Sequence, residues 1–185
     1  MMAIWPPRPR AWGICLNKVE LHIASVRGDG YLWLGPERFQ ASIGARGIVR
    51  HKEEGDSGTP AGRLALRRVL YRADRVALPR CAVPTEPIAR GDGWCDDPHH
   101  ADYNCMIRLP HAARHEALWR DDALYDVIGV LGWNDAPVVR GRGSAIFLHA
   151  ARPDYRPTAG CIALAPADLI AVLAKGLTAI DVIGG

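Results

Sequence analysis

Short stretches of alternating apolar and polar residues are the most frequent hydrophobic pattern in this chain. In the segment 15–26, apolar side chains at 19, 21 and 23 alternate with polar residues at 20 and 22, which is typical of a half-buried β-strand. The segment 31–34 is a second apolar run, and Gly28-Asp-Gly30 between the two favours a hairpin turn. Further strands are predicted at 39–43, 63–71, 124–132, 144–149 and 178–183. The pattern therefore predicts a mainly β protein that opens with a meander.

Helical spacing is clear in one segment, 166–175. Pro166 stands at its start, apolar residues recur at 169, 170, 172 and 173, and Gly176 follows its end. A second, short helix is expected at 115–122. Polar residues, glycine and proline fill 51–62 and 79–110, so we expect long irregular loops there.

Composition and charge narrow the class of protein. The 185 residues, 49% of them apolar, suffice for one domain at 12–185, which follows an irregular Pro- and Arg-rich arm at 1–11. The 23 basic and 20 acidic residues are scattered without a basic run, so we expect no nucleic-acid partner. The sequence contains no apolar span of about 18 residues, so we expect no membrane-spanning segment. We also expect a monomer. The N-terminus shows no secretory signal, which taken literally indicates a cytoplasmic protein, although a chain trimmed at its start would look the same.

The five cysteines, an odd number, leave at least one thiol free. The loop from Cys95 to Cys105 also contains His99 and His100, which are zinc-ligand types, but its spacing matches no standard zinc pattern. We expect a polar loop without a metal, in which the two cysteines are either joined in a disulfide or free. Gly28-Asp-Gly30 lacks the helix of a dinucleotide site, so no cofactor is expected. The remaining cysteines are Cys15, Cys81 and Cys161.

The candidate chemistry lies in two segments near the end of the chain. Gly143-Ser-Ala-Ile-Phe-Leu-His149 ends a predicted strand on a histidine, and Pro157-Thr-Ala-Gly-Cys-Ile-Ala-Leu164 places Cys161 directly after Gly160. If the intervening loop folds back, the imidazole stabilises the reactive thiolate of a thiol whose ordinary pKa is about 8.5. Gly160 permits a close backbone approach, so amides near Cys161 are candidates to bind an oxyanion. By itself the spacing also fits a cysteine in the core.

The run Thr158-Ala-Gly-Cys-Ile-Ala-Leu164, with His149 upstream, resembles the L,D-transpeptidase catalytic domain, also called the YkuD domain. Asp56-Ser-Gly-Thr-Pro-Ala-Gly-Arg-Leu64 is similar to the Thr-Pro-x-Gly-x-aromatic element of that family, with Leu64 where an aromatic residue is usual. The resemblance extends from about Ile43 to Asp181. It implies a sandwich-like pair of mixed sheets with one or two short helices, and a site in a groove roofed by long loops.

The motif departs from the usual family pattern in ways that bear on the substrate. Ala159 replaces a second histidine, Ala163 replaces an arginine, and the gap between His149 and Cys161 is shorter than usual. The chain therefore resembles a divergent branch of the family. The departures leave the choice of substrate and acceptor more open than the chemistry.

The resemblance implies cysteine acyl-transfer chemistry. His149 takes the thiol proton, while its other ring nitrogen is oriented by a backbone carbonyl, here expected to be that of Ala150. Cys161 attacks a peptidoglycan stem peptide at the L-centre of diaminopimelate, releases D-alanine and forms a thioester, which the amine of a second stem resolves. No metal or nucleotide is needed. The predicted function is L,D-transpeptidation, which links either L-alanine to diaminopimelate, as in a similar branch, or two diaminopimelate residues.

Two other functions stay open. With water as the acceptor, the same thioester chemistry makes an L,D-carboxypeptidase, which the missing signal peptide favours. A peptidoglycan-binding module without catalysis is the second alternative, and the retention of Cys161 and His149 argues against it. Family chemistry implies the periplasm or cell envelope, in contrast to the cytoplasmic indication of the N-terminus.

Side chains of the loop between the histidine and the cysteine are candidates for substrate contact. Arg152, Tyr155 and Arg156 suit the carboxylates of a stem peptide, since a guanidinium holds a carboxylate through two hydrogen bonds, although a solvated loop explains them equally. Thr158 and Ala159 belong to the substrate side of the motif.

Aromatic residues in more distant loops complete the candidates. In the family, the loop before the catalytic strand borders the groove, so Trp94 and Tyr103 either line it or act as packing lids. Trp133 and Asn134 form either a second wall or an ordinary turn.

Overall fold

The structure is a computed structural model that describes residues 22–185. The predicted arm at 1–11, the first part of the strand predicted at 15–26, and Cys15 lie outside the described residues. No helix among the described residues is long and apolar enough to cross a membrane.

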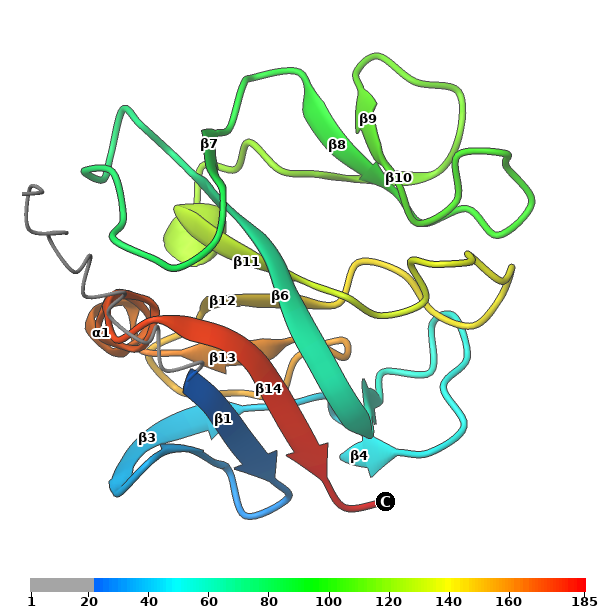
Figure 1. The fold of residues 1–185 in the computed structure, drawn as a ribbon. Coiled ribbons are helices and arrows are strands. Elements are labelled where there is room, and N and C mark those ends of the chain that lie inside the picture. Colours follow the sequence, from blue (N-terminus) through cyan, green and yellow to red (C-terminus); the bar gives the residue numbers. More distant parts are fainter. Residues whose placement is uncertain (1–21) are drawn as a thin grey trace, which may run out of the picture.

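Residues 22–185 form fourteen strands, one α-helix and one short 3-10 helix (Figure 1). The strands are β1 His22–Arg27, β2 Tyr31–Leu34, β3 Glu37–Ser42, β4 Ile48–Val49, β5 Thr59–Pro60, β6 Gly62–Tyr71, β7 Thr85–Pro87, β8 Asp92–Cys95, β9 Met106–Arg108, β10 His115–Ala117, β11 Val127–Leu131, β12 Phe147–Ala150, β13 Ile162–Leu164 and β14 Leu177–Ile183. The α-helix is α1 Pro166–Ala174, and the 3-10 helix is η1 Ala123–Tyr125.

The main sheet bends over on itself, so that it forms two layers joined by shared strands. Its nine strands follow the order β11-β12-β13-β3-β2-β1-β14-β6-β7, and the long strand β6 also pairs with β11. The first half of β6 pairs with β14 and its second half with β11, so the two ends of the sheet meet. The sheet is mixed, because β1–β14, β12–β13 and β6–β7 are parallel pairs and the others are antiparallel. The mainly β, sandwich-like prediction is confirmed.

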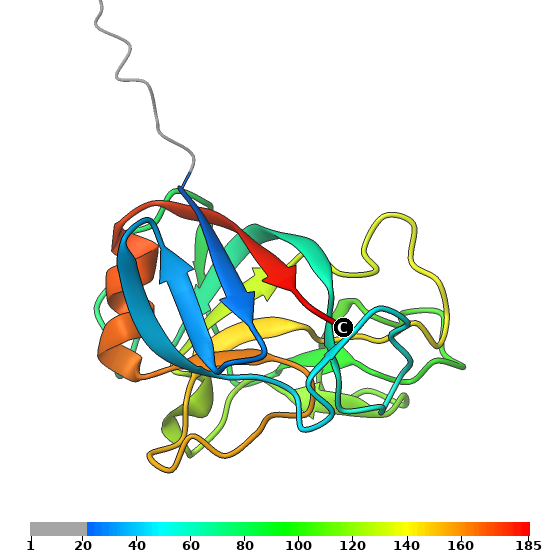
Figure 2. The same ribbon diagram turned by 90° about the horizontal axis from the view of Figure 1, so that it is seen from below.

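The hairpin of β1 and β2, the strand β6 and the helix α1 lie where their sequence patterns predict them. The helix buries Leu169, Val172 and Leu173 against the sheet, and its chain direction reverses at Gly176, which adopts a φ of +85°. In Figure 2 α1 lies on one side of the molecule, and β14 runs beside β1.

The segment predicted as an irregular loop at 79–110 instead contains β7 and most of a second sheet. Strands β8, β9 and β10 form this three-stranded sheet, which lies above β11 in Figure 1. The helix predicted at 115–122 is wrong: β10 takes up 115–117, because these residues pair with β8. Strands of three or four residues are too short to show a period in the sequence, so long-range pairing decides them.

Two hydrophobic cores lie on opposite faces of β11 and β12. On β12, Leu148 packs into the core between the two layers of the main sheet. Phe147 packs into a second core, together with Trp94 of β8 and Leu118, which follows β10. Because side chains alternate along a strand, His149 faces the same side as Phe147. Cys161 belongs to this second core, which places both residues between the main sheet and the small sheet.

Candidate active site

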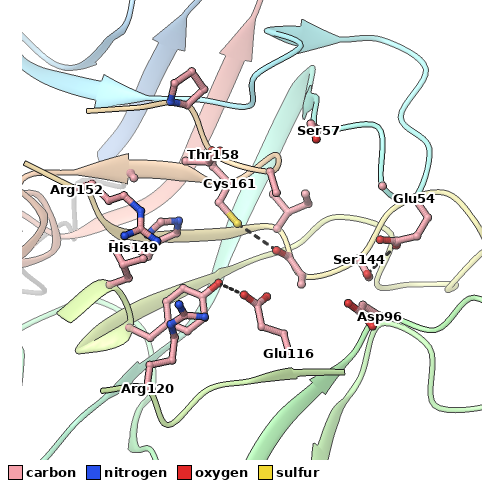
Figure 3. A pocket seen from close by; sticks show the side chains of 18 of the residues that line it. Glu54, Ser57, Asp96, Glu116, Arg120, Ser144, His149, Arg152, Thr158 and Cys161 are labelled. Atoms are coloured by element: carbon pink, nitrogen blue, oxygen red, sulfur yellow. Dashed lines mark hydrogen bonds between the residues drawn. The ribbon is translucent and has the colours of Figure 1, made fainter. Parts of the chain in front are cut away.

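Two neighbouring parallel strands bring the cysteine and the histidine together. The register of β12 and β13 pairs Leu148 with Ile162 and His149 with Ala163, and Cys161 directly precedes β13. Both residues line the same cavity (Figure 3). The predicted return of the intervening loop is therefore seen in the structure.

The thiol of Cys161 is buried and bonded to the backbone of the preceding segment. Its Sγ lies 3.2 Å from the carbonyl oxygen of Ala145, to which it donates, and it accepts from the amide of Phe147 at 3.4 Å. Burial raises the pKa of the thiol to about 12; the charge of Glu116 adds to the rise, and the Phe147 amide opposes it. The resting thiol is thus neutral at physiological pH.

His149 is held in one tautomer. Its Nδ1 lies 2.9 Å from the carbonyl oxygen of Ala150, and because a carbonyl only accepts, Nδ1 carries the proton and Nε2 is left with a free lone pair. Burial lowers the pKa of the imidazole, which is therefore neutral at physiological pH. No hydrogen bond joins the imidazole to the thiol of Cys161 in the described structure. At physiological pH the cavity therefore holds a neutral imidazole and a neutral thiol.

The cavity has a volume of about 650 Å³ and charges of both signs in its wall. The charged residues of its lining are Lys52, Glu54, Asp96, Arg114, Glu116, Arg120, Arg152 and Arg156. A ligand with both carboxylates and amines suits such a wall.

Four of the residues expected to contact substrate line this cavity: Arg152, Arg156, Thr158 and Ala159. Thr158 has a structural task as well, since its hydroxyl donates to the carbonyl of Cys161 at 2.7 Å. Tyr155 instead borders a neighbouring apolar pocket, which Arg152 also lines.

Gly160 occupies a position that a side chain would not tolerate. Its φ is +134°, and a Cβ would stand 2.8 Å from the carbonyl oxygen of Gly58, in the segment that resembles the second family element. The amide of Gly160 donates to the hydroxyl of Thr158 at 3.1 Å. This bond engages the Gly160 amide.

The lining does not include Trp94, Trp133 or Asn134. Trp94 packs edge-on against Phe147 with the ring centroids 5.2 Å apart, which is a core contact. The amide group of Asn134 bonds to the backbone of Val139 and holds a turn, and the indole of Trp133 donates to a backbone carbonyl. Tyr103 is buried as well, so these four side chains have packing or turn roles here.

Asn104 is a supporting residue that the sequence pattern did not reveal. It is buried, its Oδ1 accepts from the indole of Trp94 at 3.0 Å and from the amide of Ala145 at 3.1 Å, and its amide group donates to the carbonyl of Trp133 at 3.0 Å. It thereby fixes Ala145, the residue whose carbonyl receives the Cys161 thiol. No local motif marks this role, because all three contacts are distant in sequence.

A buried ion pair lies in the loop between β4 and β5, which contributes Lys52 to the cavity lining. The ammonium of Lys52 bonds to the carboxylate of Asp56, and the two side chains are only 3% and 5% exposed. Burial raises the pKa of Asp56, but the amide of Glu53, the ammonium of Lys52 and the amide of Gly58 together outweigh burial and lower it. Asp56 opens the segment that resembles the second family element, which was the only sequence signal for this pair.

Glu116 and Tyr125 also escaped the sequence patterns. The Tyr125 hydroxyl donates to a Glu116 carboxylate oxygen at 2.6 Å, and the Tyr125 ring stands edge-on to His149 with the centroids 5.4 Å apart. Burial raises the pKa of Glu116. A carboxylate with a raised pKa in a cavity that also holds a cysteine and a histidine marks a candidate functional site.

The loop considered for zinc gathers a different set of residues. Cys95 and Cys105 are free thiols in the structure, one buried and the other exposed. Among the described residues, one group of potential metal ligands comes together: His100, Asp102 and His111. The Nδ1 atoms of both rings already accept backbone amide protons, so we assign no metal there.

A histidine on β12 and a cysteine directly before the adjacent strand β13 line one cavity of a mainly β fold. This arrangement makes the thiol acyltransferases the candidate class for the protein. The family model of the L,D-transpeptidase catalytic domain, YkuD, matches residues 12–180, and the chain belongs to this family. The family acts on peptidoglycan stem peptides in the cell envelope.

The comparisons with individual proteins add little to the family match. No protein of curated function matches the chain. A crystal structure of Mycobacterium tuberculosis L,D-transpeptidase 1 is similar at 12% identity with a TM-score of 0.38, covering 89% of this chain. The chain spans 62% of the length of that protein.

Proposed function

We propose that this protein is an L,D-transpeptidase that forms peptidoglycan cross-links through a thioester on Cys161. The observation that carries the proposal is the placement of Cys161 beside β12, where His149 offers a free Nε2 to the same cavity. The fixed tautomer leaves that nitrogen able to accept the thiol proton. The family match supports the same chemistry.

Acylation begins when a stem peptide fills the cavity and displaces the thiol from the Ala145 carbonyl. Nε2 of His149 takes the proton as Sγ of Cys161 bonds to the scissile carbonyl carbon. The amide of Cys161 is placed next to the carbonyl oxygen as negative charge develops on it. His149 then gives the proton to the leaving amine, which leaves a neutral imidazole and a thioester.

Arg152 and Arg156 are the proposed anchors for the carboxylates of the stem peptide. Both line the cavity, and the described structure shows no ion pair between either side chain and a carboxylate of the protein. Their charge is thus available to a ligand. Tyr155, in the apolar pocket next to Arg152, is a proposed contact for an aliphatic part of the donor.

The small side chains of Ala159 and Ala163 favour a link from L-alanine to diaminopimelate. Both line the cavity at positions where the family pattern has a histidine and an arginine. The space they leave suits a donor in which the bond after the first stem residue is cleaved, since the leaving group is then a bulky peptide. A link between two diaminopimelate residues requires less space.

Product analysis with defined stem peptides tests the proposal. Purified protein is incubated with a stem tetrapeptide as donor and a stem tripeptide as acceptor, and the products are sequenced by tandem mass spectrometry. A cross-linked dimer that is absent with Cys161→Ala supports transpeptidation, and the fragment masses identify the bond. Trimmed monomer without dimer indicates a carboxypeptidase. Unchanged peptides together with measurable binding indicate a binding module.

A further inference from the structure

The three acidic side chains of the cavity, those of Glu54, Asp96 and Glu116, differ in their hydrogen-bond partners. Asp96 accepts from the guanidinium of Arg114 at 2.9 Å and is thus paired with a cation. Glu54 accepts the hydroxyls of Tyr103 at 2.5 Å and Ser144 at 2.7 Å, both on one oxygen. These two carboxylates are held by the loops that frame the cavity.

Glu116 has a single hydrogen-bond donor in the described structure, a hydroxyl, whereas Glu54 has two. That donor is Tyr125, at 2.6 Å. The nearby guanidinium of Arg120 turns to Asp122 instead, with two bonds of 2.9 and 2.8 Å. Glu116 therefore lacks a hydrogen-bonded cation, as Glu54 does, and it accepts one hydrogen bond fewer than Glu54.

The position of Glu116 relates it to the reacting groups. It extends from β10 towards the part of the cavity that holds Cys161 and His149 (Figure 3). Its partner Tyr125 stands edge-on to the His149 ring. The charge of Glu116 also contributes to the raised pKa of Cys161. A carboxylate in the same cavity as a thiol disfavours the thiolate, so Glu116 does not assist ionisation of Cys161.

We propose that Glu116 forms the subsite for the acceptor amine, binding the ammonium group of the second stem and taking one proton from it. This inference rests on the proposed transpeptidase function. An ammonium ion has no lone pair and does not attack a thioester. A carboxylate that lines the cavity can bind that cation by a charge-assisted hydrogen bond and favour its deprotonation.

The proton balance of the second step is complete with these groups. The acceptor enters with three protons on nitrogen. One passes to the Glu116 carboxylate, one passes by way of Nε2 of His149 to Sγ of Cys161 as the C–S bond breaks, and one stays on the new amide. Glu116 then loses its proton to solvent, and free thiol and neutral imidazole are restored.

The test separates the two half-reactions in the Glu116→Gln variant, which keeps an acceptor for the Tyr125 hydroxyl. Acylation is followed by the mass of the acid-quenched acyl-enzyme with the stem tetrapeptide alone. Partition is followed by the ratio of cross-linked to hydrolysed product when the tripeptide acceptor is added. We expect acylation within about threefold of wild type and a fall in the partition ratio of about 10- to 100-fold, the loss expected for one charge-assisted hydrogen bond.

Two matched variants define the result. Glu86→Gln removes the same charge at an exposed site and should leave both half-reactions unchanged. Glu54→Gln removes a second carboxylate of the cavity; if it lowers the partition ratio and Glu116→Gln does not, the inference is wrong. An unchanged ratio in Glu116→Gln also overturns it. Failure of the wild-type protein to form an acyl-enzyme would instead refute the proposed function.

Discussion

Replacing His149 by alanine should change the pH dependence of acylation at Cys161. In the proposed mechanism, Nε2 of the wild-type protein accepts the thiol proton at any pH above the pKa of the imidazole, which burial lowers from its ordinary value of 6.5. Protonation removes the base only below that lowered pKa, so the wild-type rate should be flat from pH 7 to 10. Without the imidazole, reaction requires thiolate that has already formed.

The magnitude follows from the burial of the thiol. With a pKa of about 12, the thiolate fraction is about one in 10⁵ at pH 7 and about one in 10² at pH 10. The acylation rate of His149→Ala should therefore rise about 1,000-fold over that range. At pH 7 the variant should be slower than wild type by about 10² to 10⁴, the usual loss of a general base. Most of this defect should be gone at pH 10.

The assay is the rate of acyl-enzyme formation with the stem tetrapeptide, measured by acid quench and mass spectrometry at half-unit steps of pH. His51→Ala, an exposed histidine without a hydrogen-bond partner in the described structure, is the control and should follow the wild-type profile. A variant whose rate stays flat from pH 7 to 10 would refute the reasoning. His149 would then position the substrate, and the base would have to be another group.

Two further predictions concern the framework of the site. Gly160→Ala should lose about 2 to 4 kcal/mol of unfolding free energy in urea, because strain at positive φ costs about 1 to 3 kcal/mol and the new Cβ meets the Gly58 carbonyl. Gly62→Ala, at a φ of +116° with open space around it, should lose only the strain, and equal losses in both variants would disprove the close approach. Lys52→Met should cost about 3 kcal/mol, since it leaves the buried Asp56 without its cation. The exposed pair of Lys175 supplies the contrast, because Lys175→Met should cost less than about 1 kcal/mol, and similar losses for the two lysines would contradict a buried pair.

The sequence predicted best those elements whose signal is local and long. The strand β6 has ten residues, and α1 has a proline at its start and a glycine just past its end. The strands β8, β9 and β10 escaped prediction because each has only three or four residues and depends on partners far along the chain. The same reason explains the wrong helix at 115–122, where pairing of β10 with β8 overrides local preference.

The candidate site shows the same division. The motif around Cys161 and its spacing from His149 predicted a Cys/His couple, and both residues line one cavity, although no hydrogen bond joins them in the described structure. The expected contact of Nδ1 with the Ala150 carbonyl is present at 2.9 Å. Glu116 lies in no motif. It lines the cavity because the strand that carries it, β10, packs beside the cavity in the folded chain. Burial of the thiol, which sets its high pKa, is likewise a result of packing and has no local signal.

The most direct test of the central claim is to locate the acyl group on the protein. The chain provides its own controls, since Cys81 and Cys95 are free thiols and Cys105 is both free and exposed. Protein incubated with the stem tetrapeptide is quenched in acid during turnover, digested and mapped by tandem mass spectrometry. The account predicts one acyl group per chain, on the peptide that contains Cys161, and none in Cys161→Ser. An acyl group on Cys105, or a modified Cys161→Ser protein, would contradict it.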